Sequence, residues 1–276
     1  MPFAPLDRLS SLQNPRVKAL VRLQQKAAER RAQGLTLVEG LRELAIAVGA
    51  GVAVTALYTC PELAGVATAA ALQALFPPGT GRPEWLELTR PVFEKLAYRE
   101  GSDGVLAVLR TPARTLADLR LSPNPLVLVL EAVEKPGNLG AILRTADAAP
   151  VDAVLIGDAR TDLFNPNVVR ASIGCVFTVP LVAAPMADVL DFLKGNGVRT
   201  YAAALTPRAH SYTKCNFQGP TALVLGTEAD GLTPSALAAC DDTIIIPMMG
   251  RIDSLNVSVA GAVLAFEAVR QRQEKA

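Results

Sequence analysis

The sequence contains few of the residues that commonly carry metal or imidazole chemistry. His210 is the sole histidine, and no two cysteines form a CxxC pair; the four are Cys60, Cys175, Cys215 and Cys240. Zinc and disulfide chemistry are therefore not expected. Aromatic residues make up only 5% of a chain that is 50% hydrophobic, so the core must consist mostly of Ala, Val and Leu.

Long apolar runs are also lacking. No run approaches the ~18 residues that would suggest a membrane span, and the N-terminal sequence has no apolar segment typical of a signal peptide. We therefore expect a soluble cytoplasmic protein. At 276 residues the chain is long enough for two domains, each with a core of its own.

The net charge of +1 does not by itself indicate a nucleic-acid-binding protein, but the charges are unevenly distributed. Residues 1–31 contain seven basic residues against two acidic ones. An anionic partner that contacts this end would explain the excess. A solvated helix face explains it equally well.

In the first 112 residues, short apolar stretches alternate with helical ones. The spacing of Val17, Leu20 and Leu23 predicts a basic helix from Asn14 to about Gln33. The later stretches "LTLVEG", "AVTALYTC", "EWLELT" and "DGVLAVL" have the pattern of strands separated by helices. Residues 1–112 are therefore predicted to form a small α/β domain, followed by a Pro- and Ser-containing linker at residues 113–124.

The alternation restarts in residues 125–276. The expected strands are "LVLVLE", "AVLIGD", "VFTVPLV", "VRTYAAAL", "TALVLG" and "DTIIIP", with a helix between most of them. Unbroken apolar strands of this kind predict a parallel sheet covered by helices on both faces. Ligands bind beyond the carboxyl ends of the strands in such sheets, so the residues that follow each strand are the candidate site.

Polar residues follow three of these strands. After "LVLVLE" and a Pro-Gly turn, Asn138 can cap the next helix, and Arg144 stands among apolar neighbours, as expected for a residue facing a cleft or a partner. After "TALVLG", glycines flank Glu228. After "DTIIIP", Ser254 and Asn256 precede an apolar helix that we expect to be buried, whose free amide groups they can satisfy. One polar residue would suffice for that, so two indicate a lined pocket.

Together these stretches resemble the SpoU branch of the SPOUT methyltransferases. The first family motif, an Asn followed by Leu-Gly and an Arg, matches Asn138, Leu139, Gly140 and Arg144; the second and third match "LVLGTEADGL" and "IPMMGRIDSLNVSVA". The segment "VRASIGCVFTVPL" is similar to the family's Ser-x-Gly segment, and the resemblance covers about residues 126–270. It implies an α/β domain with a deep trefoil knot, S-adenosylmethionine as methyl donor and an RNA ribose 2′-hydroxyl as acceptor.

The N-terminal half resembles the L30e type of RNA-binding domain, through "NPRVKAL" and "TLVEGLRELAIAV". The stretch "YREGSDGVLAVL" departs from the His-Gln-Gly of one branch, which leaves the target nucleotide open. The resemblance implies a structured RNA, with 23S ribosomal RNA favoured over transfer RNA. The basic N-terminal segment would supply phosphate contacts through Arg16, Lys18 and Arg22. It also implies a homodimer formed through the C-terminal domain.

The resemblance further implies roles for the site residues. The cofactor would be held by six positions: Leu225, Gly226, Ile246, Met248, Gly250 and Leu255. Arg144 would lie near the reacting hydroxyl. Because a guanidinium scarcely deprotonates, we expect Arg144 to stabilise the developing alkoxide or to bind RNA phosphate. Asn138, Glu228, Ser254 and Asn256 would then orient Arg144 and the ribose, and no metal is expected.

Three other functions fit the sequence less well. A methyltransferase of the same fold could act on a base, but the paired Asn138 and Arg144 argue against it. A noncatalytic RNA-binding or assembly factor would not need Arg144, Glu228 and Asn256 together. A nicotinamide-dependent enzyme would need a G-x-G-x-x-G after the first strand, where "EKPGNLG" has two glycines at the wrong spacing.

Overall fold

The computed structural model describes residues 3–78, 81–98 and 101–274. Residues 99 and 100, within the stretch that departs from His-Gln-Gly, lie outside this set. The chain divides into two compact units: Met1–Pro112 with Leu163–Thr178, and Ala113–Asp162 with Val179–Ala276. Within the described residues, no helix is long and apolar enough to cross a membrane.

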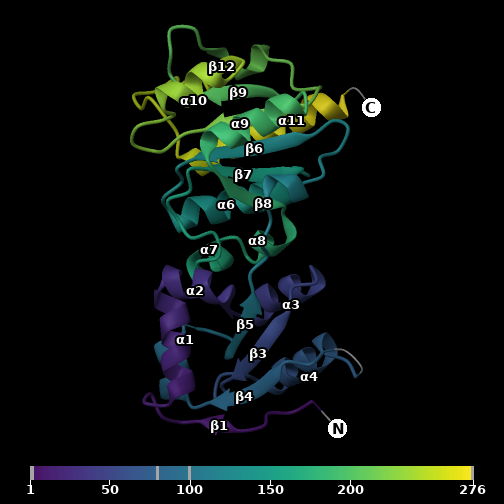
Figure 1. Ribbon diagram of the computed structural model, residues 1–276, viewed down its shortest axis with the longest axis vertical. Helices are drawn as coiled ribbons and strands as arrows, with labels where there is room; N and C mark the ends of the chain where they lie inside the picture. Colours follow the sequence, from purple (N-terminus) through teal and green to yellow (C-terminus); the bar gives the residue numbers. More distant parts are fainter. Residues whose placement is uncertain (1–2, 79–80, 99–100, 275–276) are drawn as a thin grey trace. The chain divides into compact units, whose positions relative to one another are not determined.

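The first unit is built on a five-stranded sheet in the order β1-β4-β3-β5-β2 (Figure 1). Its strands are β1 (Arg8–Leu9), β2 (Leu35–Glu39), β3 (Val54–Thr59), β4 (Glu84–Leu88) and β5 (Val105–Arg110). Strand β5 runs antiparallel to both of its neighbours. The helices are α1 (Pro15–Gln25), α2 (Ala27–Gln33), α3 (Leu41–Gly49), α4 (Val66–Leu75) and α5 (Arg90–Leu96). The unit is α/β, as predicted, and its likeness to L30e stays a prediction.

The basic N-terminal helix is broken in two, whereas the sequence pattern predicted one helix. Asn14 caps α1 through its side chain, and the chain leaves the helical conformation at Lys26, where ψ is 112°. The buried Arg30 of α2 donates to the carbonyl oxygens of Leu23 and Gln24 at 2.6 and 2.9 Å. These bonds satisfy carbonyl groups that a continuous helix would have used, and thereby stabilise the break.

Two short helices from the middle of the chain, α7 (Pro166–Ala171) and α8 (Cys175–Thr178), pack into the first unit. Thr36 of β2 donates its hydroxyl to the Phe164 carbonyl at 2.6 Å. The predicted strand "VFTVPLV" is therefore wrong in its first half, because Val176 and Phe177 lie in α8. Ile173 and Gly174 have φ of 55° and 85°, which turns the chain sharply before α8, and strand β8 begins only at Leu181.

The second unit contains a seven-stranded sheet in the order β10-β12-β9-β11-β6-β7-β8 (Figure 1). Its strands are β6 (Leu126–Glu131), β7 (Ala153–Gly157), β8 (Leu181–Ala184), β9 (Arg199–Ala203), β10 (His210–Ser211), β11 (Thr221–Leu225) and β12 (Asp242–Ile245). Every described pairing in this sheet is parallel, which confirms the predicted parallel sheet. The trefoil knot stays a prediction.

Alternate strand residues point to opposite faces of this sheet. Both faces are apolar, and helices cover both. Val127 and Val129 of β6 belong to one cluster with residues of α9 (Met186–Gly195) and α10 (Pro234–Ala239). On the other face, α6 (Pro136–Ala148) packs against α11 (Val257–Gln273). Part of the predicted linker forms a short 3-10 helix, Leu116–Asp118. The next residue, Leu119, is buried in the cluster that contains Val127 and Val129.

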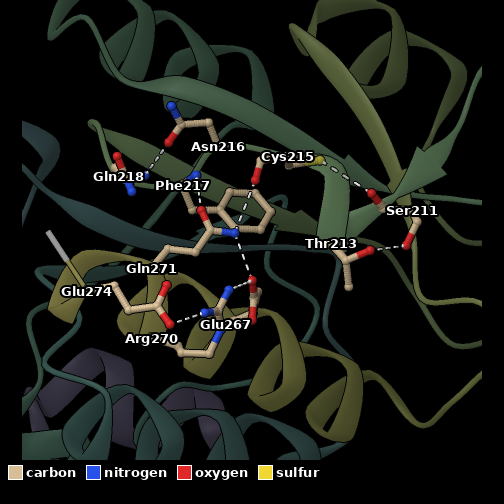
Figure 2. Close-up of polar contacts among 10 residues, drawn as sticks. All are labelled: Ser211, Thr213, Cys215, Asn216, Phe217, Gln218, Glu267, Arg270, Gln271 and Glu274. Carbon is tan, nitrogen blue, oxygen red and sulfur yellow. Dashed lines mark hydrogen bonds and ion pairs between the residues drawn. The ribbon is translucent and has the colours of Figure 1, made fainter.

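The last helix, α11, is held near its C-terminal end by the segments that precede β6 and β11. The Gln271 side chain accepts from the Phe217 amide at 2.8 Å and donates to the Cys215 carbonyl at 3.1 Å (Figure 2). Arg272 donates to four carbonyl oxygens, those of Asn124, Pro125, Phe217 and Gly219. These bonds hold one end of the helix whose other end carries Asn256.

The expectation that α11 is buried on nearly all sides is wrong. Gly261, Leu264, Ala265 and Ala268 are buried, but Val259 and Phe266 are 47% and 48% exposed. One side of α11 packs against α6 and the sheet, and the other presents apolar side chains to solvent. A helix that is apolar on all sides can therefore leave one side free for another surface.

Candidate active site

Two side-chain amides that are far apart in the sequence meet at one carboxylate. Glu228 Oε1 accepts from the Asn138 side-chain amide at 2.5 Å and from the Asn256 side-chain amide at 2.7 Å. The Asn256 amide also lies 3.1 Å from the Asn138 carbonyl oxygen, Oδ1. The sequence placed these residues after three separate strands, and the fold brings them into one hydrogen-bonded cluster.

Asn256 serves both the cluster and the helix that follows it. Its Oδ1 accepts from the Ser258 backbone N–H at 2.9 Å and thereby caps α11, while its amide group donates to Glu228. Asn138 does not cap α6, contrary to expectation: the N-cap is Lys135, and Asn138 lies within the first turn. Ser254 does not cap α11 either, since its hydroxyl donates to Asp253 at 3.0 Å.

The loop that carries Glu228 is held in shape by its neighbours. Thr227 and Gly231 form an isolated bridge that closes the loop. At its far end, the buried Glu131 of β6 accepts from the backbone and hydroxyl of Thr233 at 2.8 and 2.7 Å. Gly226 is packed so closely that an added Cβ would lie 2.1 Å from the Gly231 carbonyl carbon. The backbone on the two sides of the loop therefore approaches too closely to admit a side chain at position 226.

Glu228 has an ionic partner that the sequence analysis missed. The Lys135 ammonium forms an ion pair with Glu228 Oε2. Lys135 and then Asn138, both donating hydrogen bonds, hold the pKa of Glu228 below its ordinary value. Lys135 lies in the connection between β6 and α6, where no sequence pattern distinguishes it from a solvated lysine.

Arg144 stands apart from this cluster, two helical turns along α6 from the loop. Its side chain is exposed, and among the described residues its guanidinium has no hydrogen-bond or ion-pair partner. Its apolar neighbours Ile142 and Leu143 are buried. An unpaired guanidinium beside a polar cluster is available to an anionic ligand.

Next to the cluster lies a cavity of about 520 Å³ at the carboxyl ends of β9, β11 and β12. Five of the six residues predicted to hold the cofactor line it: Leu225, Gly226, Ile246, Met248 and Leu255. Ser254 lines it too, so this serine faces the cavity rather than the amide cluster. Gly250 is exposed and is not among the lining residues. Residues 203–206, at and after the end of β9, form a further wall that the sequence pattern did not indicate.

The three residues predicted to bind RNA differ in how free their charges are. Arg16 is paired with Glu84 at 2.7 Å, and Arg22 lies 3.8 Å from Glu29. Lys18 is exposed, and no described residue pairs with its ammonium. Of the three, only Lys18 offers a full charge to a ligand without breaking an ion pair.

Two family profiles match the chain. The profile of the SpoU rRNA Methylase family matches residues 125–266, more than half of the chain. The chain belongs to the SpoU rRNA Methylase family. A second profile, the MRM3-like substrate binding domain, matches residues 14–107.

Individual members of the SpoU family support the match. The chain is 36% identical over 179 residues to 23S rRNA (guanosine(2553)-2′-O)-methyltransferase RlmP of Bacillus subtilis, covering 65% of this chain and 70% of that one. A crystal structure of an RNA 2′-O ribose methyltransferase covers 96% of this chain and 99% of its own, at 38% identity and a TM-score of 0.83. The SpoU methyltransferase AviRb of Streptomyces viridochromogenes, in complex with AdoMet, covers 95% and 99%, at 28% identity and a TM-score of 0.85.

These matches confirm the predicted family, its α/β fold, its class of enzyme and its cofactor, S-adenosylmethionine. The cavity fits that cofactor, because its lining combines apolar side chains with the backbone of Gly226, directly after β11. Gly226 has no side chain that could stand between this backbone and a ligand.

The packing of Gly226 yields a prediction about cofactor affinity. In Gly226→Ala the new methyl group must displace the Gly231 backbone, so the loop moves and S-adenosylmethionine binds roughly tenfold more weakly or worse, as about 1.4 kcal/mol corresponds to a factor of ten. Isothermal titration calorimetry measures this. The control is Gly219→Ala, where the added methyl meets nothing within 4 Å. Equal affinity in both variants would show that the loop does not shape the cavity.

Proposed function

We propose that this protein transfers the methyl group of S-adenosylmethionine to the ribose 2′-hydroxyl of a guanosine in 23S ribosomal RNA, in the cytoplasm. One observation carries the proposal: Asn138, Glu228 and Asn256 converge beside the cavity that would take the cofactor. The RNA and the nucleoside are those named for the Bacillus subtilis relative. The match of residues 14–107 to a substrate-binding domain supports a large RNA substrate.

The cavity residues would hold the cofactor, which supplies an activated methyl group on a sulfonium. Leu225, Ile246, Met248 and Leu255 would enclose its adenosyl part, and the Gly226 backbone would approach it closely. What remains for the protein is to align the ribose oxygen with this methyl group, since positioning of this kind can contribute roughly 7–11 kcal/mol. Ser254, on the cavity wall, would take part in this alignment.

The amide cluster would orient the ribose. Asn256 uses both N–H donors of its side-chain amide within the cluster, one on Glu228 and one on Asn138. Asn138 donates one N–H to Glu228 and would present its second N–H to the substrate. The exposed Arg144 would lie toward the RNA strand and stabilise the alkoxide that forms as the hydroxyl loses its proton, or hold the adjoining phosphate. A guanidinium performs both tasks without giving up a proton.

The direct test is nucleoside analysis of ribosomal RNA after incubation with labelled cofactor. A 2′-O-methylated guanosine is expected, and exclusively base-methylated nucleosides would contradict the proposal. Arg144→Ala should lower kcat on the order of 10²-fold, as loss of an alkoxide-stabilising donor does. Cofactor affinity should persist in this variant, because Arg144 lies outside the cavity lining. Loss of cofactor binding by calorimetry would contradict this role.

The basic N-terminal helices would contact RNA phosphates. Lys18 would contribute more to this binding than Arg16 or Arg22, which are already paired with glutamates. Lys18→Ala should reduce the slope of log K against log salt by about 0.7, the value for one phosphate contact on a single strand. Arg16→Ala should change it less, since the Glu84 pair already neutralises Arg16. Filter binding across a salt series measures both, with the exposed Lys194 of α9 replaced by alanine as control. Equal slopes in all variants would exclude this helix from the RNA contact.

We also propose that the protein is a homodimer joined through α11, whose exposed Val259 and Phe266 would be covered by a second copy. Phe266→Asp should then yield monomers in sedimentation velocity at micromolar concentration, because a charge would be buried in the interface. Val66→Asp serves as control, since Val66 is 91% exposed on α4 of the first unit. A wild-type protein that sediments as an active monomer would contradict the dimer.

A further inference from the structure

Lys135 occupies a position that the stability of its own helix does not favour. It is the N-cap residue of α6, where its side chain makes no capping hydrogen bond. A cation at this end faces the positive pole of the helix dipole, and lysine is not among the residues that cap helices well. Its presence therefore calls for another explanation, which its contacts supply.

The explanation lies in the charges around the Glu228 carboxylate. A small pocket of about 110 Å³ beside the cluster is lined by three acidic residues, Glu134, Glu228 and Asp230. Lys135 is the one basic residue among the described residues that line it. Glu134 has a partner outside this lining, Arg160, at 2.6 Å. Lys135 thus supplies the positive charge beside Glu228, and its hydrogen bond is the largest cause of the lowered pKa of that carboxyl group.

The amide cluster depends on Glu228 being ionised. Its Oε1 accepts two amide donors, from Asn138 and Asn256, and its Oε2 accepts the Lys135 ammonium. A protonated carboxyl group would present a donor of its own where three donors already point at it. The ionised form also fixes which end of each Asn amide faces Glu228, and so which atoms remain for a substrate.

We infer that Lys135 is a positioning residue for methyl transfer, which acts through Glu228 by holding the Asn138 and Asn256 amides in their productive orientation. The inference rests on the proposed function and extends it to a residue outside the three motifs. Lys135 is 69% exposed and Glu228 is 26% exposed, so the pair lies at the mouth of the site rather than in the core. A merely structural pair at such exposure would contribute little to folding.

The two possible roles of Lys135, orienting Glu228 or binding RNA phosphate directly, differ in the kinetic parameter that they affect. Loss of orientation lowers kcat and leaves the KM for RNA unchanged, whereas loss of a phosphate contact raises KM and reduces the salt slope by about 0.7. For Lys135→Met we expect kcat to fall roughly fivefold, the upper range for an exposed ion pair. Lys135→Arg restores the charge and should restore kcat. Lys194→Met, at an exposed lysine on α9, is the control.

A double-mutant cycle then tests whether Lys135 acts through Glu228. In the Glu228→Gln background, Lys135→Met should cause no further loss of kcat, because the partner is already gone. An equal loss in both backgrounds, or a KM effect with unchanged kcat, would overturn the inference. Single-turnover reactions with excess enzyme keep slow variants measurable.

A spectroscopic measurement decides the matter independently of turnover. In wild-type protein, NMR of labelled Asn side chains should show the Asn138 and Asn256 amides protected from exchange at neutral pH, with protection lost as pH falls through the depressed pKa of Glu228. The sign follows from the depressed pKa: the network is intact above it and lost below it. In Lys135→Met the loss should move to higher pH, and Lys135→Arg should reverse this. Unchanged protection in Lys135→Met would overturn the inference even if the RNA substrate proved to be a different one.

Discussion

The site depends on one carboxylate that collects donors from separate parts of the chain. Asn138 and Lys135 precede or begin α6, Asn256 precedes α11, and Glu228 lies on the loop after β11. A carboxylate can accept several hydrogen bonds at once, so it joins these segments without requiring their backbones to touch. Because α6 and α11 pack together on one face of the sheet, their first turns arrive at the same edge. The positions of the two helix N-termini therefore determine where the Asn138 and Asn256 side-chain amides lie.

The same arrangement explains why α11 is fastened at both ends. Asn256 caps its start and binds Glu228. Near its end, Gln271 binds backbone groups of Cys215 and Phe217 (Figure 2), and Arg272 binds carbonyl groups of residues 217, 219, 124 and 125. Gly261, near its start, allows the helix to approach Leu225 closely. A helix held in this way has little freedom to slide, so the side chain at its N-cap keeps its position. The exposed apolar side of the helix, which carries Val259 and Phe266, remains available for contact with another surface.

Much of this could be predicted from the sequence, since buried parallel strands are unbroken apolar runs and polar residues after them share one sheet edge. Asn138, Glu228 and Asn256 were identified on that basis. The errors have local causes. Lys26 interrupts a helix because a buried Arg30 binds carbonyl groups of the preceding turn, and "VFTVPLV" is half helical because a left-handed turn at Ile173 and Gly174 precedes it. Neither a side-chain bond across a break nor a residue's φ is visible in hydrophobic periodicity.

Lys135 could not be predicted from the sequence for a different reason. Periodicity and turn chemistry describe a residue by its own segment, and within its own segment Lys135 is a poor N-cap at the wrong end of a helix dipole. Its position is favoured only by Glu228, which lies 93 residues further along the chain. A residue that is unfavourable locally and paired at long range is more informative about function than one that fits its helix well, because local stability cannot account for it. Active-site residues can therefore be recognised in two ways. Some belong to conspicuous motifs, and others, such as Lys135, are unfavourable in their own helix but paired with a residue far along the chain.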